Sequence, residues 1–258
     1  MKRATILLVP LLLWPDLASA AVIEPHAEYQ SCLSMARSKP EEGWEEAIAW
    51  QSLGGGEPAR HCAALALIGL GKYEEAAKRL EALAEQSRRE ELLRAQMLEQ
   101  AAQAWDLAGQ PERALANLEA GLVLVPGQPD LLLDKAVLLA GRGHYAEALT
   151  VLTAILNAQP NRVEALTLRG SALRQLNRAE EAKRDLARAL DLDPNFPDAL
   201  LERGMLRRGA GDAAGARADW MRAIERAPDS PTADTARRNI ELMDVKIPGL
   251  PSRSPLGG

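Results

Sequence analysis

Four prolines recur at one fixed interval from the middle of the chain toward its C-terminal end. Pro126, Pro160, Pro194 and Pro228 are each separated from the next by 34 residues. Such a period indicates repeated structural units, each too small to bury its own apolar face and therefore stacked on its neighbours. With each proline at position 32 of a unit, the units begin at Ala95, Pro129, Val163 and Pro197.

Small residues fill two positions of this repeat. Position 8 holds Ala102, Ala136, Gly170 and Gly204, and position 20 holds Ala114, Ala148, Ala182 and Ala216. Position 24 is large in every unit, namely Leu118, Leu152, Leu186 and Trp220. Two helices approach closely only where small side chains meet, and larger ones then fill the adjacent gaps. Each unit is therefore predicted to be a pair of helices that cross at these positions.

The ends of the predicted helices carry their own signals. Position 15 holds residues that tolerate the left-handed conformation of a helix exit, namely Gly109, Gly143, Asn177 and Gly211. Asn161, Asn195 and Ser230 stand where the following helix needs an N-cap.

The regular pattern weakens toward both ends of the chain. Residues 57–94 predict a further unit with four extra residues, which we expect to lengthen its second helix by one turn. Residues 21–56 predict an atypical pair of helices, and residues 231–244 predict a single capping helix. Residues 245–258 are rich in Pro, Gly and Ser, which is typical of a disordered tail.

These residues resemble the tetratricopeptide repeat family over residues 57–244, with a degenerate match from about residue 26. The resemblance implies an all-α fold, a right-handed α-solenoid of tetratricopeptide-type helix-turn-helix repeats. The repeats would be residues 57–94, 95–128, 129–162, 163–196 and 197–230. Family members usually hold a peptide or a partner domain on a concave face, so the resemblance implies a non-catalytic protein-protein interaction scaffold.

The resemblance also implies which residues face the ligand. Positions 2, 5, 9, 12 and 13 would form a groove that is apolar in its middle and at the C-terminal repeat, and acidic toward its N-terminal side. Within it, the expected partner-binding residues are Leu133, Val137, Thr167, Ser171, Arg174, Gln175, Leu201, Met205 and Arg208. No repeat has Lys at position 5 with Asn at position 9, the pair with which chaperone-binding members clamp a carboxylate. The alternative is a structural, self-associating homo-oligomeric envelope protein.

The first twenty residues are typical of an export signal. Basic Lys2 and Arg3 precede an apolar stretch, and Ala18-Ser19-Ala20 is an A-x-A cleavage site. A cleavable signal peptide at residues 1–20 predicts a periplasmic or secreted protein, and an uncleaved anchor is the alternative. After cleavage, we expect no stable membrane span.

The sequence predicts no catalytic, cofactor or metal site. Cys32 and Cys62 are either a disulfide or two free thiols. Among the histidines, His144 is expected in solvent and His61 on the partner-binding face, and their spacing matches no zinc site. The net charge is −5 with scattered basic residues, which predicts no nucleic-acid partner. An enzyme with a site around His61, Cys32 and Cys62 is the weakest alternative.

Two ion pairs are expected inside the repeats. Arg169 and Arg203 occupy position 7, and Asp185 and Asp219 occupy position 23 of the same units. Because position 7 adjoins one small residue and position 23 lies one turn from the other, the helix crossing should join these charges. We predict Arg169–Asp185 and Arg203–Asp219 salt bridges with a structural role.

Overall fold

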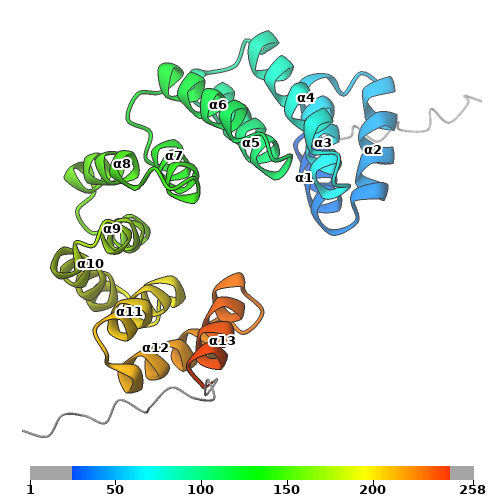
Figure 1. Cartoon of the computed structure of the whole chain (residues 1–258). Coiled ribbons are helices and arrows are strands. Elements are labelled where there is room, and N and C mark those ends of the chain that lie inside the picture. Colours follow the sequence, from blue (N-terminus) through cyan, green and yellow to red (C-terminus); the bar gives the residue numbers. More distant parts are fainter. Residues whose placement is uncertain (1–24, 245–258) are drawn as a thin grey trace, which may run out of the picture. The chain divides into compact units, whose positions relative to one another are not determined.

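The computed structural model describes residues 25–244, which form thirteen α-helices and no strand within that range (Figure 1). The predicted signal peptide at residues 1–20 and the predicted tail at residues 245–258 lie outside the described residues. The chain divides into two compact units at Gly69 and Leu70. This division falls inside the predicted repeat 57–94, between its two helices.

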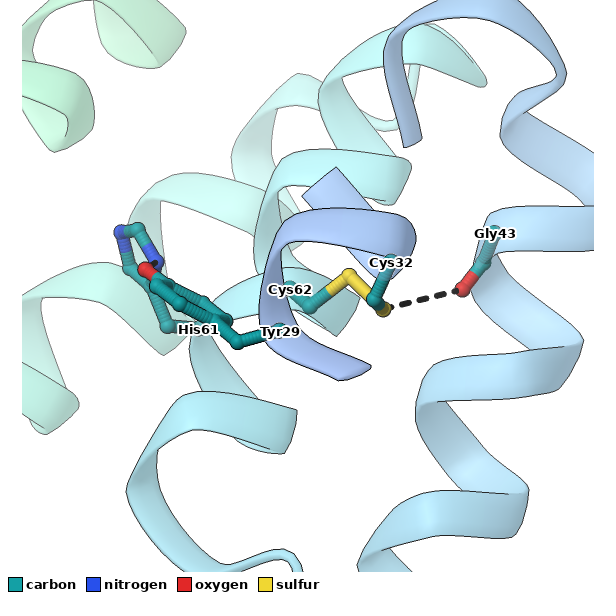
Figure 2. Close-up of a disulfide and its surroundings, with 5 residues drawn as sticks. All are labelled: Tyr29, Cys32, Gly43, His61 and Cys62. Carbon is teal, nitrogen blue, oxygen red and sulfur yellow. Dashed lines mark hydrogen bonds between the residues drawn. A yellow bond between two sulfur atoms is a disulfide. The ribbon is translucent and has the colours of Figure 1, made fainter. Parts of the chain in front are cut away.

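The first unit contains a disulfide in a core of small residues. Its helices are α1 (Pro25–Ser38), α2 (Pro40–Ser52) and α3 (Gly56–Gly69). Cys32 of α1 is bonded to Cys62 of α3, and both cysteines are fully buried (Figure 2). Gly43 of α2 packs against α1 so closely that an added Cβ atom would lie 2.6 Å from the backbone nitrogen of Ala36. The disulfide and this close contact together tie the three helices.

The second unit is a solenoid in which each helix packs against the next one in the sequence. The first helices of successive repeats, α5, α7, α9, α11 and finally α13, also contact one another. The predicted all-α solenoid of helix-turn-helix repeats is thus confirmed for this unit. Its helices are α4 (Tyr73–Gln86), α5 (Glu91–Leu107), α6 (Pro111–Leu124), α7 (Pro129–Gly141), α8 (Tyr145–Ala158), α9 (Val163–Gln175), α10 (Ala179–Leu192), α11 (Pro197–Gly209), α12 (Ala213–Arg226) and α13 (Pro231–Asp244).

The small residues lie at the helix crossings, as predicted. Each of the alanines at position 20 is at most 1% exposed. An added Cβ atom on Gly170 would lie 2.8 Å from the Cγ atom of Leu186, and one on Gly204 would lie 2.6 Å from the Cδ1 atom of Trp220. No side chain larger than hydrogen fits at these two glycines unless the side chain of Leu186 or Trp220 moves.

The turns within the repeats are also as predicted. The residue at position 15 has a positive φ in every unit, between 59° at Asn177 and 85° at Gly211. Because residues other than glycine and asparagine rarely adopt this conformation, these positions fix where the first helix ends.

The position of the extra turn differs from our expectation. Helix α4 ends at Gln86, because Ser87 is extended with a ψ of 136°, and α5 begins at Glu91. The four additional residues therefore lengthen the first helix of the following repeat, and the prediction of a longer second helix is wrong. The Nε atom of Arg94 donates to the carbonyl oxygen of Ala84, 2.9 Å away, which satisfies a carbonyl group near the end of α4.

One of the three predicted N-caps is confirmed, and two are wrong. The hydroxyl of Ser230 accepts a hydrogen bond from the backbone amide of Ala233 at the start of α13. The side-chain oxygen of Asn161 instead accepts from the guanidinium group of Arg188 at 2.7 Å, and that of Asn195 accepts from Arg222 at 2.9 Å. A charged donor makes the stronger hydrogen bond, and the two asparagines thereby connect successive repeats.

Candidate functional site

Three first helices, α7, α9 and α11, line a groove of about 380 Å³. We call it the central groove. Its walls carry five large apolar side chains, two hydroxyl side chains and three carboxylates. The lining residues are Leu133, Val137, Leu168, Phe196, Leu201, Thr167, Ser171, Glu164, Asp198 and Glu202.

Five of the nine predicted partner-binding residues meet in the central groove: Leu133, Val137, Thr167, Ser171 and Leu201. Positions four residues apart on a helix share one face, so successive first helices present the same face side by side. Val137 is 48% exposed. Thr167 is buried and its hydroxyl donates to the carbonyl oxygen of Val163, 2.9 Å away, so it forms the floor of the groove.

The apolar wall of the central groove is anchored in the protein core. Leu133, Leu168 and Phe196 pack against the buried cluster that α7 to α12 share. Residues held in this way lose little conformational freedom when a ligand covers them. Leu168 and Phe196 were not predicted to belong to the groove, although Phe196 is the only phenylalanine in the chain.

The other four predicted residues lie outside the central groove. Arg174, Gln175 and Met205 line a separate hollow of about 900 Å³ between α9, α10 and α11. The sulfur of Met205 accepts a hydrogen bond from Asn239 of α13, and its side chain packs against the core cluster there. Arg208 is exposed on α11 and lines neither cavity.

Arg174 is held by an ion pair at the edge of the central groove. Its Nε atom lies 3.0 Å from a carboxylate oxygen of Glu202, and both side chains are mostly buried. Glu164 is less fully compensated, because its ion pair with Arg162 spans 3.8 Å. Asp198 accepts a hydrogen bond from the hydroxyl of Thr232. Glu202 is therefore neutralised, and the negative charge of the rim comes from Asp198 and, in part, from Glu164.

A second, smaller hollow of about 120 Å³ adjoins the central groove between α5 and α7, and Val137 lines both. Its polar residues are Gln103, Asp106 and Asp134, and we call it the acidic hollow. Burial, with the charges of Asp134 and Asp130, raises the pKa of nearby Glu99 from 4.5 to about 7. This is the acidic N-terminal side that the sequence predicted.

Replacing Glu99 with Gln should remove a pH-dependent loss of stability. The folded state raises the pKa of Glu99 to about 7. The stabilisation from the protonated carboxyl group is therefore complete below pH 4.5 and is lost as the pH rises through 7. Because the side chain is only half buried, we expect Glu99→Gln to raise the free energy of unfolding on the order of 1 kcal/mol at about pH 8.

Chemical denaturation of wild type and Glu99→Gln at about pH 4 and about pH 8 measures this effect. Glu225→Gln, an exposed position on α12, is the matched control and should behave like wild type at both values. If Glu99→Gln raises the free energy of unfolding equally at both pH values, the charge on Glu99 is not the cause of the stabilisation.

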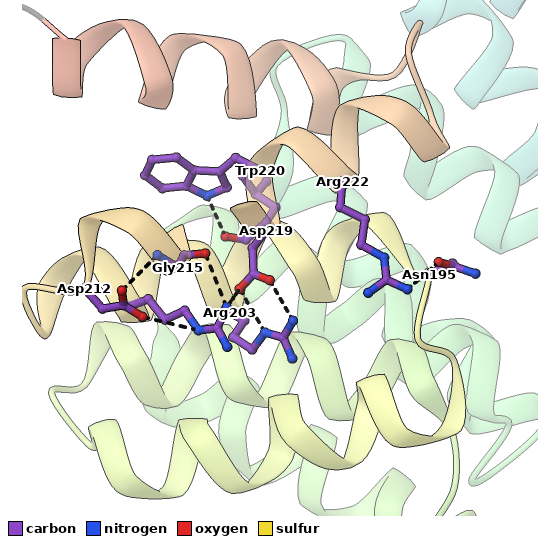
Figure 3. Close-up of polar contacts among 9 residues, drawn as sticks. Asn195, Arg203, Asp212, Gly215, Asp219, Trp220 and Arg222 are labelled. Carbon is purple, nitrogen blue, oxygen red and sulfur yellow. Dashed lines mark hydrogen bonds and ion pairs between the residues drawn. The ribbon is translucent and has the colours of Figure 1, made fainter. Parts of the chain in front are cut away.

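The two predicted ion pairs are confirmed, and they lie at the helix crossings. Arg169 contacts both oxygens of Asp185 at 2.7 and 2.8 Å. Arg203 contacts both oxygens of Asp219 at 2.9 and 2.6 Å, and Figure 3 shows this second pair. A third arginine, Arg207, was not predicted to take part, yet its Nη1 atom lies 2.8 Å from Asp219. These groups hold the paired helices of a repeat together.

His61, Cys32 and Cys62 of the first unit do not form an accessible reactive site. His61 is buried, and its Nδ1 atom lies 2.6 Å from the hydroxyl of Tyr29, so its expected place on a partner-binding face is wrong (Figure 2). Neither sulfur of the Cys32–Cys62 disulfide is a thiol nucleophile. His144 of the second unit is exposed in its turn, as predicted, beside Glu147.

Metal-binding clusters and membrane-spanning helices are both absent from residues 25–244. No group of three or more His, Cys, Asp or Glu side chains in this range is arranged to hold a metal ion. None of the helices in the same range combines the length and the apolarity of a membrane-spanning segment.

Family models for the tetratricopeptide repeat match residues 107–171 and residues 167–231. No curated protein matches the sequence. Among solved structures, MamA from Desulfovibrio magneticus RS-1 is 24% identical, with a TM-score of 0.56 over 67% of this chain and 97% of that one. A thermophilic TPR protein of Thermus thermophilus, TTC0263, is 21% identical, with a TM-score of 0.57 over 72% of this chain and 100% of that one.

A third solved structure is that of YrrB, a TPR protein with an unusual peptide-binding site. It is 19% identical, with a TM-score of 0.50 over 74% of this chain and 96% of that one. At these identities, the likeness concerns the fold alone. The family models and the solved structures agree with the arrangement of helices described above.

Proposed function

We propose that the chain is a non-catalytic scaffold of the tetratricopeptide repeat type that binds a partner protein in the central groove, as the family matches to residues 107–171 and 167–231 support. Proteins with this repeat generally mediate protein-protein interactions. The observation that carries the proposal is the apolar wall: Val137 is 48% exposed at the point where three first helices meet. An exposed apolar surface with a polar rim is typical of a protein-binding site.

The groove favours a segment of the partner rather than a broad flat surface. Its length across three adjacent helices suits an extended chain or one helix that places an apolar side chain between Leu133, Val137 and Leu201. Carboxylates at the rim favour a segment with Lys or Arg beside its apolar anchor. Support also comes from YrrB, a protein of similar fold that has a peptide-binding site.

We further propose that the protein acts in the periplasm or is secreted. The basic and apolar residues before Ala20 support this location. The disulfide between Cys32 and Cys62 also supports it, because such bonds persist mainly in oxidising compartments. Edman sequencing of the protein from an extracellular or periplasmic fraction tests the proposal, which requires an N-terminus at Ala21.

Blocking the central groove should abolish partner capture without unfolding the protein. We expect Val137→Asp with Ser171→Glu to reduce capture of the partner at least about tenfold, which corresponds to about 1.4 kcal/mol. Both positions are accessible to solvent, so neither change disturbs the core. The measurement compares proteins from the same cell fraction that are retained by immobilised wild-type and variant chains.

The matched control is Val123→Asp with Thr150→Glu. Val123 is 78% exposed on α6, and Thr150 is exposed on α8, so the same changes occur outside the groove. Partners that bind wild type and this control, but not the groove variant, support the proposal. A partner retained equally by all three proteins would show that the groove is not the binding site.

A further inference from the structure

The sequence after α13 has the chemistry that the central groove favours. Residues 245–258 contain two basic residues, Lys246 and Arg253, and no acidic residue. They also contain four aliphatic side chains, Val245, Ile247, Leu250 and Leu256. The residues that line the groove include three carboxylates and no basic side chain, and of the three Glu202 is paired with Arg174 and Glu164 more loosely with Arg162. The segment and the groove are thus complementary in charge and in apolar character.

The described part of the chain ends on α13, the helix whose first turn contacts the central groove through Thr232 and Asp198. The last residue of α13, Asp244, forms an ion pair with Arg217 of α12. Its neighbour Met243 packs against the same core cluster as Leu201, and Leu201 also lines the groove. The chain therefore leaves α13 roughly 18 Å along the helix from the turn that contacts the groove.

Residues 245–258 are long enough to cross the groove. An extended chain covers roughly 3.3 Å per residue, so this segment spans roughly 46 Å. Adjacent helices lie roughly 10 Å apart, so a path across α11, α9 and α7 needs roughly 20 to 30 Å. The segment can reach the apolar wall at Val137 from its point of attachment.

We propose that residues 245–258 occupy the central groove of their own chain and compete there with the partner protein. The inference rests on the proposed function, because it concerns the same groove. Leu250 would enter the apolar wall, and Arg253 would meet the negative rim near Glu164. Three prolines, Pro248, Pro251 and Pro255, reduce the conformational entropy that the segment loses on binding.

Attachment to the same chain strengthens this contact. A tethered segment has an effective concentration on the order of millimolar, so even a weak interaction keeps the groove filled. A partner must then displace the segment before it binds. Only a partner that binds the groove more tightly than the segment does would therefore occupy the scaffold.

The test uses a fluorescent synthetic peptide with the sequence of residues 245–258 and two full-length proteins. One is wild type, and the other carries Lys246→Glu, Leu250→Asp and Arg253→Glu. We expect the peptide to bind the variant at least about tenfold more tightly than wild type, because the altered segment no longer competes. Adding Val137→Asp and Ser171→Glu to the variant should abolish this binding, and adding Val123→Asp should not.

Three outcomes would overturn the inference. The peptide binds neither protein, it binds both equally, or its binding survives the groove substitutions. Concentration-dependent dimers of wild type that the tail variant does not form would also overturn it, because the segment would then bind a second copy. If the groove variant loses the partner while the peptide fails to bind, only this inference is wrong and the proposed function stands.

Discussion

Replacing Ala182 with Glu is expected to lower the free energy of unfolding of the C-terminal repeats by about 4 kcal/mol or more. Ala182 is fully buried where α10 crosses α9, and Gly170 on the opposite helix leaves room only for a methyl group. A Glu side chain would separate the helices and leave an unpaired charge in the gap. Chemical denaturation gives the energy, and hydrogen exchange identifies which helices open.

The control is Ala187→Glu, which makes the same change on an exposed face of α10. It should change the free energy of unfolding by less than about 0.5 kcal/mol. In the Ala182→Glu protein, we expect hydrogen exchange to increase first in α9 and α10. Equal stability of the two variants would show that this crossing does not hold the repeat together.

The repeat could be predicted from the sequence because its steric requirement is local. Ala182 and Gly170 must be small whichever neighbours surround them, since their own two helices meet there. The same argument applies to Asn177 in the turn, where the positive φ restricts the residue type. Once the crossing is fixed, positions 7 and 23 must face each other, and the ion pair of Arg169 with Asp185 follows.

The sequence could not show which of several possible hydrogen-bond partners a side chain would contact. Asn161 and Asn195 have the residue type of an N-cap, but an arginine of the following repeat reaches each of them first. His61 lies at a position that faces the ligand in related repeats, yet Tyr29 of the atypical first helix covers it. These three errors each concern a side chain whose hydrogen-bond partner comes from another repeat or helix pair.

In the candidate site too, the residues that the repeat pattern determines could be predicted, and the others could not. Leu133, Val137 and Leu201 share one helical face, so the repeat alone places them together. Met205 occupies the same position in its repeat as Val137, but α13 covers it because the array ends there. Phe196 enters the groove from the segment before α11, where helical periodicity gives no information.

Replacing Asp219 with Asn is expected to cost about 3 to 4 kcal/mol of unfolding free energy, because two arginines then lose their shared counter-ion. The Asp219 side chain is 5% exposed and binds both Arg203 and Arg207. Asn keeps the shape of Asp but accepts fewer hydrogen bonds and carries no charge. Asp185→Asn is the matched comparison, since Asp185 is 12% exposed and binds one arginine at its crossing.

We expect Asp185→Asn to cost less, about 2 kcal/mol, because only one arginine is left without its counter-ion and the carboxylate itself is more exposed. A double-mutant cycle separates the ion pair from other effects of Asp219→Asn. The double variant Arg203→Met with Asp219→Asn should lose at least about 1 kcal/mol less unfolding free energy than the two single variants lose in sum. Either single substitution already breaks the ion pair, so the second cannot break it again. Strict additivity would mean that Arg203 and Asp219 do not interact in solution. If Asp219→Asn still costs about 3 to 4 kcal/mol while its effect adds to that of Arg203→Met, Arg207 is the arginine that matters. A second double-mutant cycle, between Arg207 and Asp219, would then show the coupling energy.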